Sequence, residues 1–341
     1  MDWPSITIVF VVYNRREALR TSLRKMLLES DYEGRIDAIV VDNASSDGSA
    51  EMVRREFPQV ELLVREENIG APAWNAGFAA ARGDWVLISD DDCYLPPDGF
   101  TRAIVAAAEH EADLVSFRVV STYDPEFAFS DHYKTGLFSF WGCSALFRRE
   151  VIQELGGYDP EIFMWANELE LTLRFFDRGY RHLHLPEVEA RHMKPPADGR
   201  GSFAREPAYL FNMRHFAYIA AKLFRPRYAL ESLMALLAHA LREGVRDDPA
   251  ALRAVPDVIR GFARGLQCRK PLRNPELSRC YRANFASFAS FWWFARPAGE
   301  LLRAYPRDLL RREKPPRSPR IDEYYERRSR YYPDHAATLD F

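Results

Sequence analysis

The stretch GDWVLISDDDCYLPPDGF, residues 83–100, places an apolar run directly before three consecutive carboxylates. The run is typical of a buried β-strand, and Asp90, Asp91 and Asp92 stand where this strand ends. Like charges this close repel one another and are costly to remove from water, so without a cation one of the carboxyl groups should take up a proton. A bound metal ion removes this conflict, and we expect one here.

Strand and helix patterns alternate in the residues before this stretch. ITIVFVVYN (6–14), RIDAIVVDN (35–43) and QVELLV (59–64) are apolar runs, each followed by a polar turn and then by a helical pattern. This alternation predicts a parallel α/β sheet, in which ligands bind at the carboxyl ends of the strands. Asn14, Asp42, Asn43 and Asn68 fall at such ends, as do the three aspartates. We therefore expect all these side chains to converge.

Length and composition exclude several classes of protein. The chain has 341 residues, of which 47% are hydrophobic and 28% charged, enough for one large domain or two. No apolar run approaches the ~18 residues of a membrane span, and the first residues lack the features of a signal peptide. The four cysteines form no CxxC pair, so neither a zinc knuckle nor a disulfide framework is indicated. These features predict a cytoplasmic protein.

The charge is distributed unevenly along the chain. Residues 1–199 carry 20 Lys and Arg against 34 Asp and Glu, a net charge of −14, whereas residues 200–341 carry 27 against 15, a net charge of +12. An acidic half suits a cation site, and a basic half suits an anionic lipid surface or a phosphate-bearing acceptor. The alternative is that the two halves attract each other.

Between residues 195 and 205 the pattern changes from alternating strands and helices to helices alone. Further strand and helix patterns continue to about residue 195, and from residue 205 the spacing of apolar residues is helical with several prolines. We predict an α/β catalytic domain over residues 1–200. Residues 201–341 form a mostly helical region for contacts with the acceptor, a membrane surface or another subunit.

Five motifs together resemble a known family. They are TIVFVVYNRREALRTSL (7–23), VVDNASSDGSA (40–50), ENIGAPAWNAGFAAARGDWVLISDDD (67–92), WGCSALFRREVIQELGGYD (141–159) and NELELTLRFFDRGYRHLHLP with ARH (167–192). In order and spacing they are similar to the inverting family 2 glycosyltransferases of the GT-A fold. The resemblance covers roughly residues 5–195 and implies a Rossmann-like mixed sheet flanked by helices. It also implies transfer of a sugar from a nucleoside diphosphate to a hydroxyl group, as in cell-envelope polysaccharide or glycoconjugate synthesis.

The resemblance also implies which residues bind the donor and a metal ion. Asp92 and His192 would hold Mn²⁺ or Mg²⁺, and Asp90 or Asp91 would bind the ribose or the water shell of the ion. Other donor-binding residues are expected at Val11, Tyr13, Asn14, Asp42, Asn43, Asn68, Gly70 and Asn75. Many members have Thr or Ser near Val11 and a second Asp where Asn43 stands. The alternative for Asp42 and Asn43 is a turn that caps its own backbone.

Alignment through the sequence LTLR assigns the general base to Glu168. Members usually have two acids where Asn167 and Glu168 stand, and a third at the position of Glu170. Replacing the first acid by Asn167 removes a like charge that would raise the pKa of Glu168. The alternative is that Glu168 caps the helix and Glu170 faces solvent.

Two other classes of function are compatible with parts of the sequence. One is a catalytically inactive scaffold of the same fold that binds a nucleotide sugar or a glycan. The other is phosphoryl transfer with an aspartate nucleophile, which would require that aspartate on the first strand rather than the fourth.

The partners expected for a glycosyltransferase are a donor and an acceptor. The donor is a nucleoside-diphosphate sugar, with UDP or dTDP favoured over GDP, and the acceptor is a glycan or lipid-linked. No nucleic-acid partner is expected, and a homo-oligomer is compatible with the sequence. The aromatic, arginine-flanked segment 284–305 would lie peripherally on the inner face of the cell membrane or pack as core.

Overall fold

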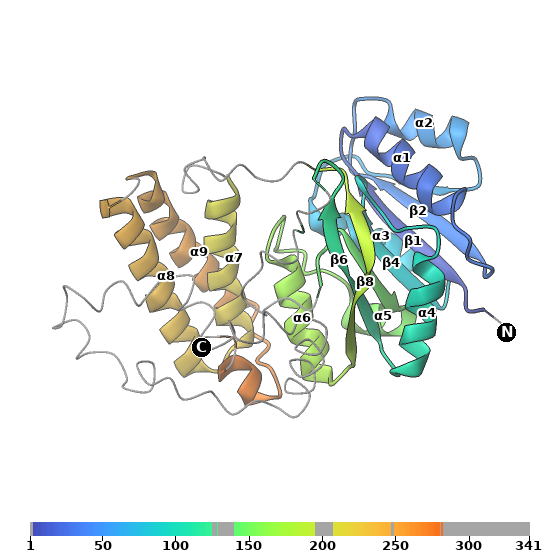
Figure 1. Ribbon diagram of the computed structural model, residues 1–341. Helices are drawn as coiled ribbons and strands as arrows, with labels where there is room; N and C mark the ends of the chain where they lie inside the picture. Colours follow the sequence, from blue (N-terminus) through green and yellow to red (C-terminus); the bar gives the residue numbers. More distant parts are fainter. Residues whose placement is uncertain are drawn as a thin grey trace. The chain divides into compact units, whose positions relative to one another are not determined.

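A mixed sheet of eight strands organises the N-terminal part of the chain (Figure 1). The computed structural model describes residues 3–124, 128, 140–194, 207–246, 249–279 and 281. The chain divides into two compact units, the first containing the described residues up to 194 and the second those from 207 onward. The α/β sheet and the helical C-terminal region are as predicted, whereas the functions assigned to the two regions remain predictions.

The order of the strands in the sheet is β3-β2-β1-β4-β7-β6-β8-β5. The strands are β1 (Ile6–Val12), β2 (Ile36–Asp42), β3 (Glu61–Val64), β4 (Trp85–Asp90), β5 (Cys93–Tyr94), β6 (Leu114–Ser121), β7 (Ser144–Arg148) and β8 (His182–His192). The helices of this unit are α1 (Arg16–Leu27), α2 (Ser49–Glu56), η1 (Ala71–Ala73), α3 (Trp74–Ala80), α4 (Gly99–Glu109), α5 (Arg149–Leu155) and α6 (Asn167–Arg178).

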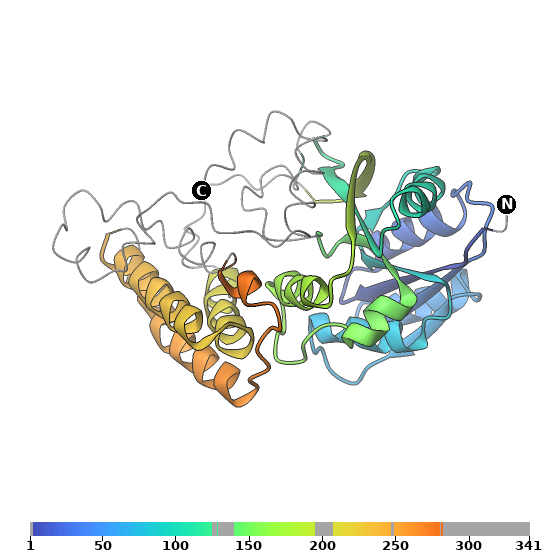
Figure 2. The same cartoon turned by 90° about the horizontal axis from the view of Figure 1, so that it is seen from below.

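Helices cover both faces of the sheet, as Figures 1 and 2 show. All seven residues of β1 are buried, which explains why this strand is a continuous apolar run rather than an alternating one. Because side chains alternate along a strand, Ile8 and Phe10 face the core that α1, α2 and α4 help to form. Val9 faces the opposite way, against Gly77 of α3.

Strands β3, β2, β1 and β4 are mutually parallel, so their carboxyl ends lie along one edge. Strand β7 is antiparallel to both β4 and β6. Strand β8 runs parallel to β6, with an irregularity in register after Phe117, and continues until His192 lies opposite Cys93 of β5. The short β5 directly follows Asp92, so this pairing brings the end of β8 to the acidic end of β4.

The second unit is built from α7 (Pro207–Leu223), α8 (Pro226–Arg246), η4 (Pro249–Arg253) and α9 (Ala254–Gln267). Gly261 and Gly265 place the backbone of α9 directly against carbonyl groups of α7, where a Cβ atom would clash. After α9 the chain turns back, and the backbone N–H groups of Lys270 and Leu272 donate to the last carbonyls of α7, both at 2.9 Å. These bonds satisfy groups that a helix end leaves without partners.

None of the helices in the described ranges combines the length and the apolar character that a membrane span requires. The aromatic segment 284–305, for which the sequence predicts a membrane or core role, lies outside the described residues.

A turn at Gly156 and Gly157 joins α5 to Tyr158, whose side chain is buried against Trp74 and Phe78. Both glycines have positive φ values, 75° and 68°. The side-chain amide of Asn75 donates to the carbonyl of Tyr158 and accepts from its N–H, each at 2.8 Å. A Cβ atom on Gly157 would collide with Asn75, whereas nothing lies within 4 Å of a Cβ atom on Gly156.

We expect Gly157→Ala to destabilise the protein more than Gly156→Ala. Both substitutions force a left-handed backbone on alanine, at a cost of about 1 kcal/mol, but only Gly157→Ala also displaces Asn75, which raises its cost to about 3 kcal/mol. Urea unfolding followed by circular dichroism measures both. Equal losses of stability would show that Asn75 does not hold this turn.

Candidate active site

The acidic stretch lies where the end of β4 meets β5 and β8. Asp90 is the last residue of β4 and is paired with Val11 of β1, so it lies at the carboxyl ends of the parallel strands. Asp92 directly precedes β5, and its carbonyl accepts a hydrogen bond from the N–H of Met193 at 2.8 Å. The chain is therefore held on both sides of Asp92, and His192 is brought close to it from 100 residues away.

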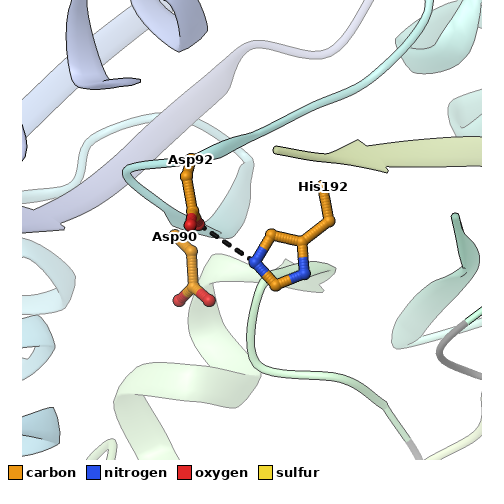
Figure 3. A group of neighbouring side chains, drawn as sticks. All are labelled: Asp90, Asp92 and His192. Atoms are coloured by element: carbon orange, nitrogen blue, oxygen red, sulfur yellow. Dashed lines mark hydrogen bonds and ion pairs between the residues drawn. The ribbon is translucent and has the colours of Figure 1, made fainter. Parts of the chain in front are cut away.

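Asp90, Asp92 and His192 form a group that could hold a metal ion (Figure 3). Each offers one ligand atom, and these atoms lie within 4.8 Å of one another. The Nε2 atom of His192 is 3.1 Å from Oδ1 of Asp92. Two carboxylates and an imidazole form a donor set suited to Mn²⁺, and Mg²⁺ accepts the carboxylates. The donor set therefore fits the metal that the sequence predicts.

The ionisation of these carboxyl groups reflects the conflict between buried like charges. Burial, together with the neighbouring charge of Asp92, raises the pKa of Asp90 to about 6. Burial would also raise the pKa of Asp92, but the hydrogen bond with His192 and the charges of His192 and Arg15 hold it below its usual range. A divalent cation would favour the charged form of both carboxylates.

Asp91 is not a member of this group. Its side chain is buried and lies 3.3 Å from the guanidinium of Arg15, and its carbonyl accepts a hydrogen bond from the hydroxyl of Ser22. Burial raises its pKa well above the usual value, although Arg15 opposes the shift. The direct part of Asp91 in donor or metal binding remains a prediction.

The turns after β2 and β3 are tied together by amide groups. Asn43 is buried, donates to Oδ1 of Asn68 at 2.7 Å and accepts from the N–H of Ile69 at 3.1 Å. Asp42, also buried, accepts from the N–H of Ser45 at 2.8 Å. The bond of Asp42 to Ser45 has the local backbone-capping form of the alternative, whereas Asn43 bonds to the turn after β3 and not to its own turn. Contact of either residue with a nucleoside remains a prediction.

Gly70 allows the turn after β3 to approach the loop before α6. Its φ is 69°, and a Cβ atom at this position would clash with the carbonyl of Phe163, which accepts a hydrogen bond from the N–H of Ala71 at 2.6 Å. The positive φ and the close approach are two separate reasons for glycine at this position.

The predicted donor residues at the end of β1 differ in exposure. Val11 is buried, whereas Tyr13 is 48% exposed. Asn14 has a φ of 55°, and its side-chain oxygen accepts from the N–H of Ser46 at 2.7 Å, which joins this loop to the turn after β2. Asn75 uses both ends of its amide on Tyr158, so its expected contact with the donor also remains a prediction.

Glu168 lies in the first turn of α6. The two residues before this helix, Trp165 and Ala166, have φ values of 58° and 60°, an uncommon backbone for residues other than glycine. Burial, with a smaller contribution from the charge of Asp90, raises the pKa of Glu168 to about 7, although the backbone N–H groups of Glu168 and Gly142 oppose the shift. A Cβ atom on Gly142 would occupy the space of this carboxylate.

Glu170 has a different environment. It is fully buried, and its carboxylate pairs with the guanidinium of Arg174 at 2.6 Å. Arg174 also donates to the carbonyl of Gly157 at 2.6 Å, which links α6 to the turn after α5. The alternative in which Glu170 faces solvent is therefore wrong. The ion pair with Arg174 compensates the cost of burying its carboxylate.

Two residues near the carboxylates were not among the predicted site residues. Arg15 lies against Asp91 and Asp92, and Gly142 makes room for Glu168. Arg15 could have been noticed because it directly follows Asn14 at a strand end. Nothing in the sequence of residues 141–148 indicates that Gly142 lies against Glu168.

Comparisons with known proteins agree with this arrangement. Residues 7–156 match the family model described as Glycosyl transferase family 2. Glycosyltransferase AglE of Haloferax volcanii is 24% identical over 212 residues, which cover 57% of this chain and 68% of AglE. N-acetylglucosaminyl-diphospho-decaprenol L-rhamnosyltransferase of Mycobacterium tuberculosis is 23% identical over 286 residues, which cover 69% of this chain and 92% of that enzyme. Other curated relatives match over 30% to 53% of their own length.

Among solved structures, residues 1–349 of TarS from S. aureus align with a TM-score of 0.52 and 16% identity. The alignment covers 86% of this chain and 91% of the TarS chain, a similarity of fold. The family match, the relatives and the fold agree with one another: residues 7–156 of this chain are similar to glycosyl transferase family 2.

Proposed function

We propose that this protein is a metal-dependent inverting glycosyltransferase that uses a nucleoside-diphosphate sugar. The observation that carries the proposal is the group formed by Asp90, Asp92 and His192 at the carboxyl end of β4. When bound there, a divalent cation supplies positive charge that stabilises the departing diphosphate. TarS, whose fold this chain shares, has been solved in complex with UDP-GlcNAc, which supports UDP as the first nucleotide to test.

In this proposal Asp92, Asp90 and His192 hold the cation, and Asp42, Asn43 and the end of β1 lie around the nucleoside. Glu168 accepts the proton of the acceptor hydroxyl, which attacks the anomeric carbon on the face opposite the diphosphate. A pKa of about 7 suits this role, because a base with a pKa near the working pH is both available and effective.

Changing Asp92→Asn should abolish metal-dependent donor binding. The substitution keeps the shape of the side chain but removes the charge that a hard cation requires, so Mn²⁺ should no longer increase the affinity for UDP. Isothermal titration with UDP, with and without Mn²⁺, measures the effect, and Asp98→Asn at the exposed start of α4 is a matched control. Parental binding of UDP and Mn²⁺ by the Asp92 variant would refute the metal assignment.

Glu168→Gln should leave donor affinity near the parental value and lower turnover by a factor of about 10² to 10⁴, the range for loss of a general base. In the parent, the ionised form of Glu168 becomes dominant as the pH rises through its pKa of about 7, so turnover should rise over the same range. The variant should lack this rise. The measurement is turnover against pH, and the same rise in the variant would place the base elsewhere.

Glu170→Gln is the matched control for this experiment. It leaves Arg174 without its buried partner and should destabilise the protein by about 3 kcal/mol. The pH dependence of turnover should stay parental at temperatures where the variant is folded.

We further propose a lipid-linked acceptor and peripheral contact with an anionic membrane. The relative from M. tuberculosis is named for transfer to a decaprenol-linked sugar. In the second unit, Leu252, Ile259 and Leu266 are exposed and repeat every seven residues along η4 and α9. The exposed Arg253, Arg260 and Arg264 lie on the adjoining side of the same helical surface. Apolar side chains bordered by arginines suit the headgroup region of an anionic bilayer.

Ile259→Ser combined with Leu266→Ser should weaken binding to vesicles of phosphatidylglycerol and phosphatidylcholine by about tenfold, because each change removes apolar area from the contact. Vesicle flotation measures binding, and high salt should weaken binding of the parent. Leu28→Ser, at an exposed apolar residue of the first unit, is the control. If the parent does not bind the vesicles at low salt, the proposed membrane-binding surface is ruled out.

A further inference from the structure

Arg15 places a positive charge against the acidic stretch from the loop between β1 and α1. Its Nη1 atom is 2.6 Å from Oδ2 of Asp92 and 3.3 Å from Oδ1 of Asp91. Both carboxylates are buried, whereas the side chain of Arg15 is 54% exposed. The guanidinium therefore covers the carboxylates from the solvent side.

The backbone of Arg15 is anchored while the end of its side chain is accessible. The preceding residue, Asn14, is tied to Ser45 and Ser46 through its N–H and its side-chain oxygen. The carbonyl of Arg15 accepts a hydrogen bond from the N–H of Leu19 at 3.0 Å, which starts α1. Only the side chain has to rotate for the guanidinium to leave Asp92.

The contacts of Asp92 leave little room for a second cation. Oδ2 lies against Arg15, and Oδ1 lies 3.1 Å from Nε2 of His192. A divalent ion held by Asp90, Asp92 and His192 would lie close to the guanidinium, and charges of like sign repel strongly in a partly buried site. Simultaneous binding of Asp92 by the divalent ion and by the guanidinium of Arg15 is therefore unfavourable.

We propose that Arg15 is a counter-ion that the metal displaces from Asp92. In the metal-free protein Arg15 neutralises Asp91 and Asp92 and stabilises the acidic turn. Metal binding releases the guanidinium from Asp92, so Arg15 lowers the affinity for the free ion. This inference depends on the metal site of the proposed function.

The test measures the affinity for Mn²⁺ alone, without nucleotide, by isothermal titration. Arg15→Gln should bind Mn²⁺ about tenfold more tightly or better, comparable with the change of one or more pKa units that a nearby charge causes in proton affinity. Without metal the variant should also have a lower melting temperature than the parent, and Mn²⁺ should restore more of its stability.

Two matched controls separate displacement from other effects of charge. Lys194→Gln removes a charge that acts on Asp90 but, among the described residues, makes no ion pair with Asp92, so it should change the affinity for Mn²⁺ less than threefold. Arg16→Gln changes the neighbouring arginine, which bonds to Glu17 and Asp47, and should leave the affinity near the parental value. Arg15→Met is a second neutral variant in case Arg15→Gln does not fold.

The outcomes distinguish this inference from the proposed function. If neither the parent nor the Arg15 variants bind Mn²⁺, with or without UDP, or if Asp92→Asn binds it as well as the parent, both the metal site and the displacement are refuted. If the parent binds Mn²⁺ through Asp92 but the neutral Arg15 variants bind it no more tightly, only the displacement is refuted. An equal gain in Lys194→Gln would also refute it, by showing a general effect of positive charge.

Discussion

The crowding of three carboxylates at the end of β4, two of them buried, is the constraint around which the first unit is organised. Asp91 and Asp92 are almost completely removed from water, and Asp90 is partly exposed beside them. Such an arrangement is unfavourable unless positive charge or hydrogen-bond donors compensate it. Arg15 comes from the loop after β1, and His192 comes from the end of β8. The compensation therefore requires both halves of the sheet to be correctly assembled.

Strand β5 is a short strand that holds the far side of the acidic turn. Its two residues pair with the end of β8, and the bond from the N–H of Met193 to the carbonyl of Asp92 extends the contact by one residue. The pairing fixes the backbone on the far side of the acidic turn, while β4 fixes it on the near side. The backbone therefore holds together candidate metal ligands that lie 100 residues apart in the sequence. Only the rotamers of their side chains remain to be fixed.

Glu168 and Glu170 show how position along one helix separates two acids. The residues are two apart, so their side chains point in different directions around α6. Glu170 faces inward, where Arg174 pairs with it and also binds carbonyls at the end of α5. Glu168 faces Gly142 and has no ion pair among the described contacts, so burial raises its pKa to about 7. One acid is paired within the fold, and the other is the candidate base of the proposed function.

The sequence alone predicts the strand and helix pattern of the first unit, its resemblance to family 2 glycosyltransferases and the positions at strand ends where polar side chains gather. Local patterns suffice for this, because apolar periodicity and turn residues act within a few positions. Only the tertiary structure decided which of these side chains meet. It separated Asp91 from the group of Asp90, Asp92 and His192, used the amide of Asn75 on Tyr158 and enclosed Glu170 with Arg174. It also brought Arg15 to the acidic turn and placed Gly142 against Glu168. These contacts depend on strand order and helix packing between distant segments, which no local pattern encodes.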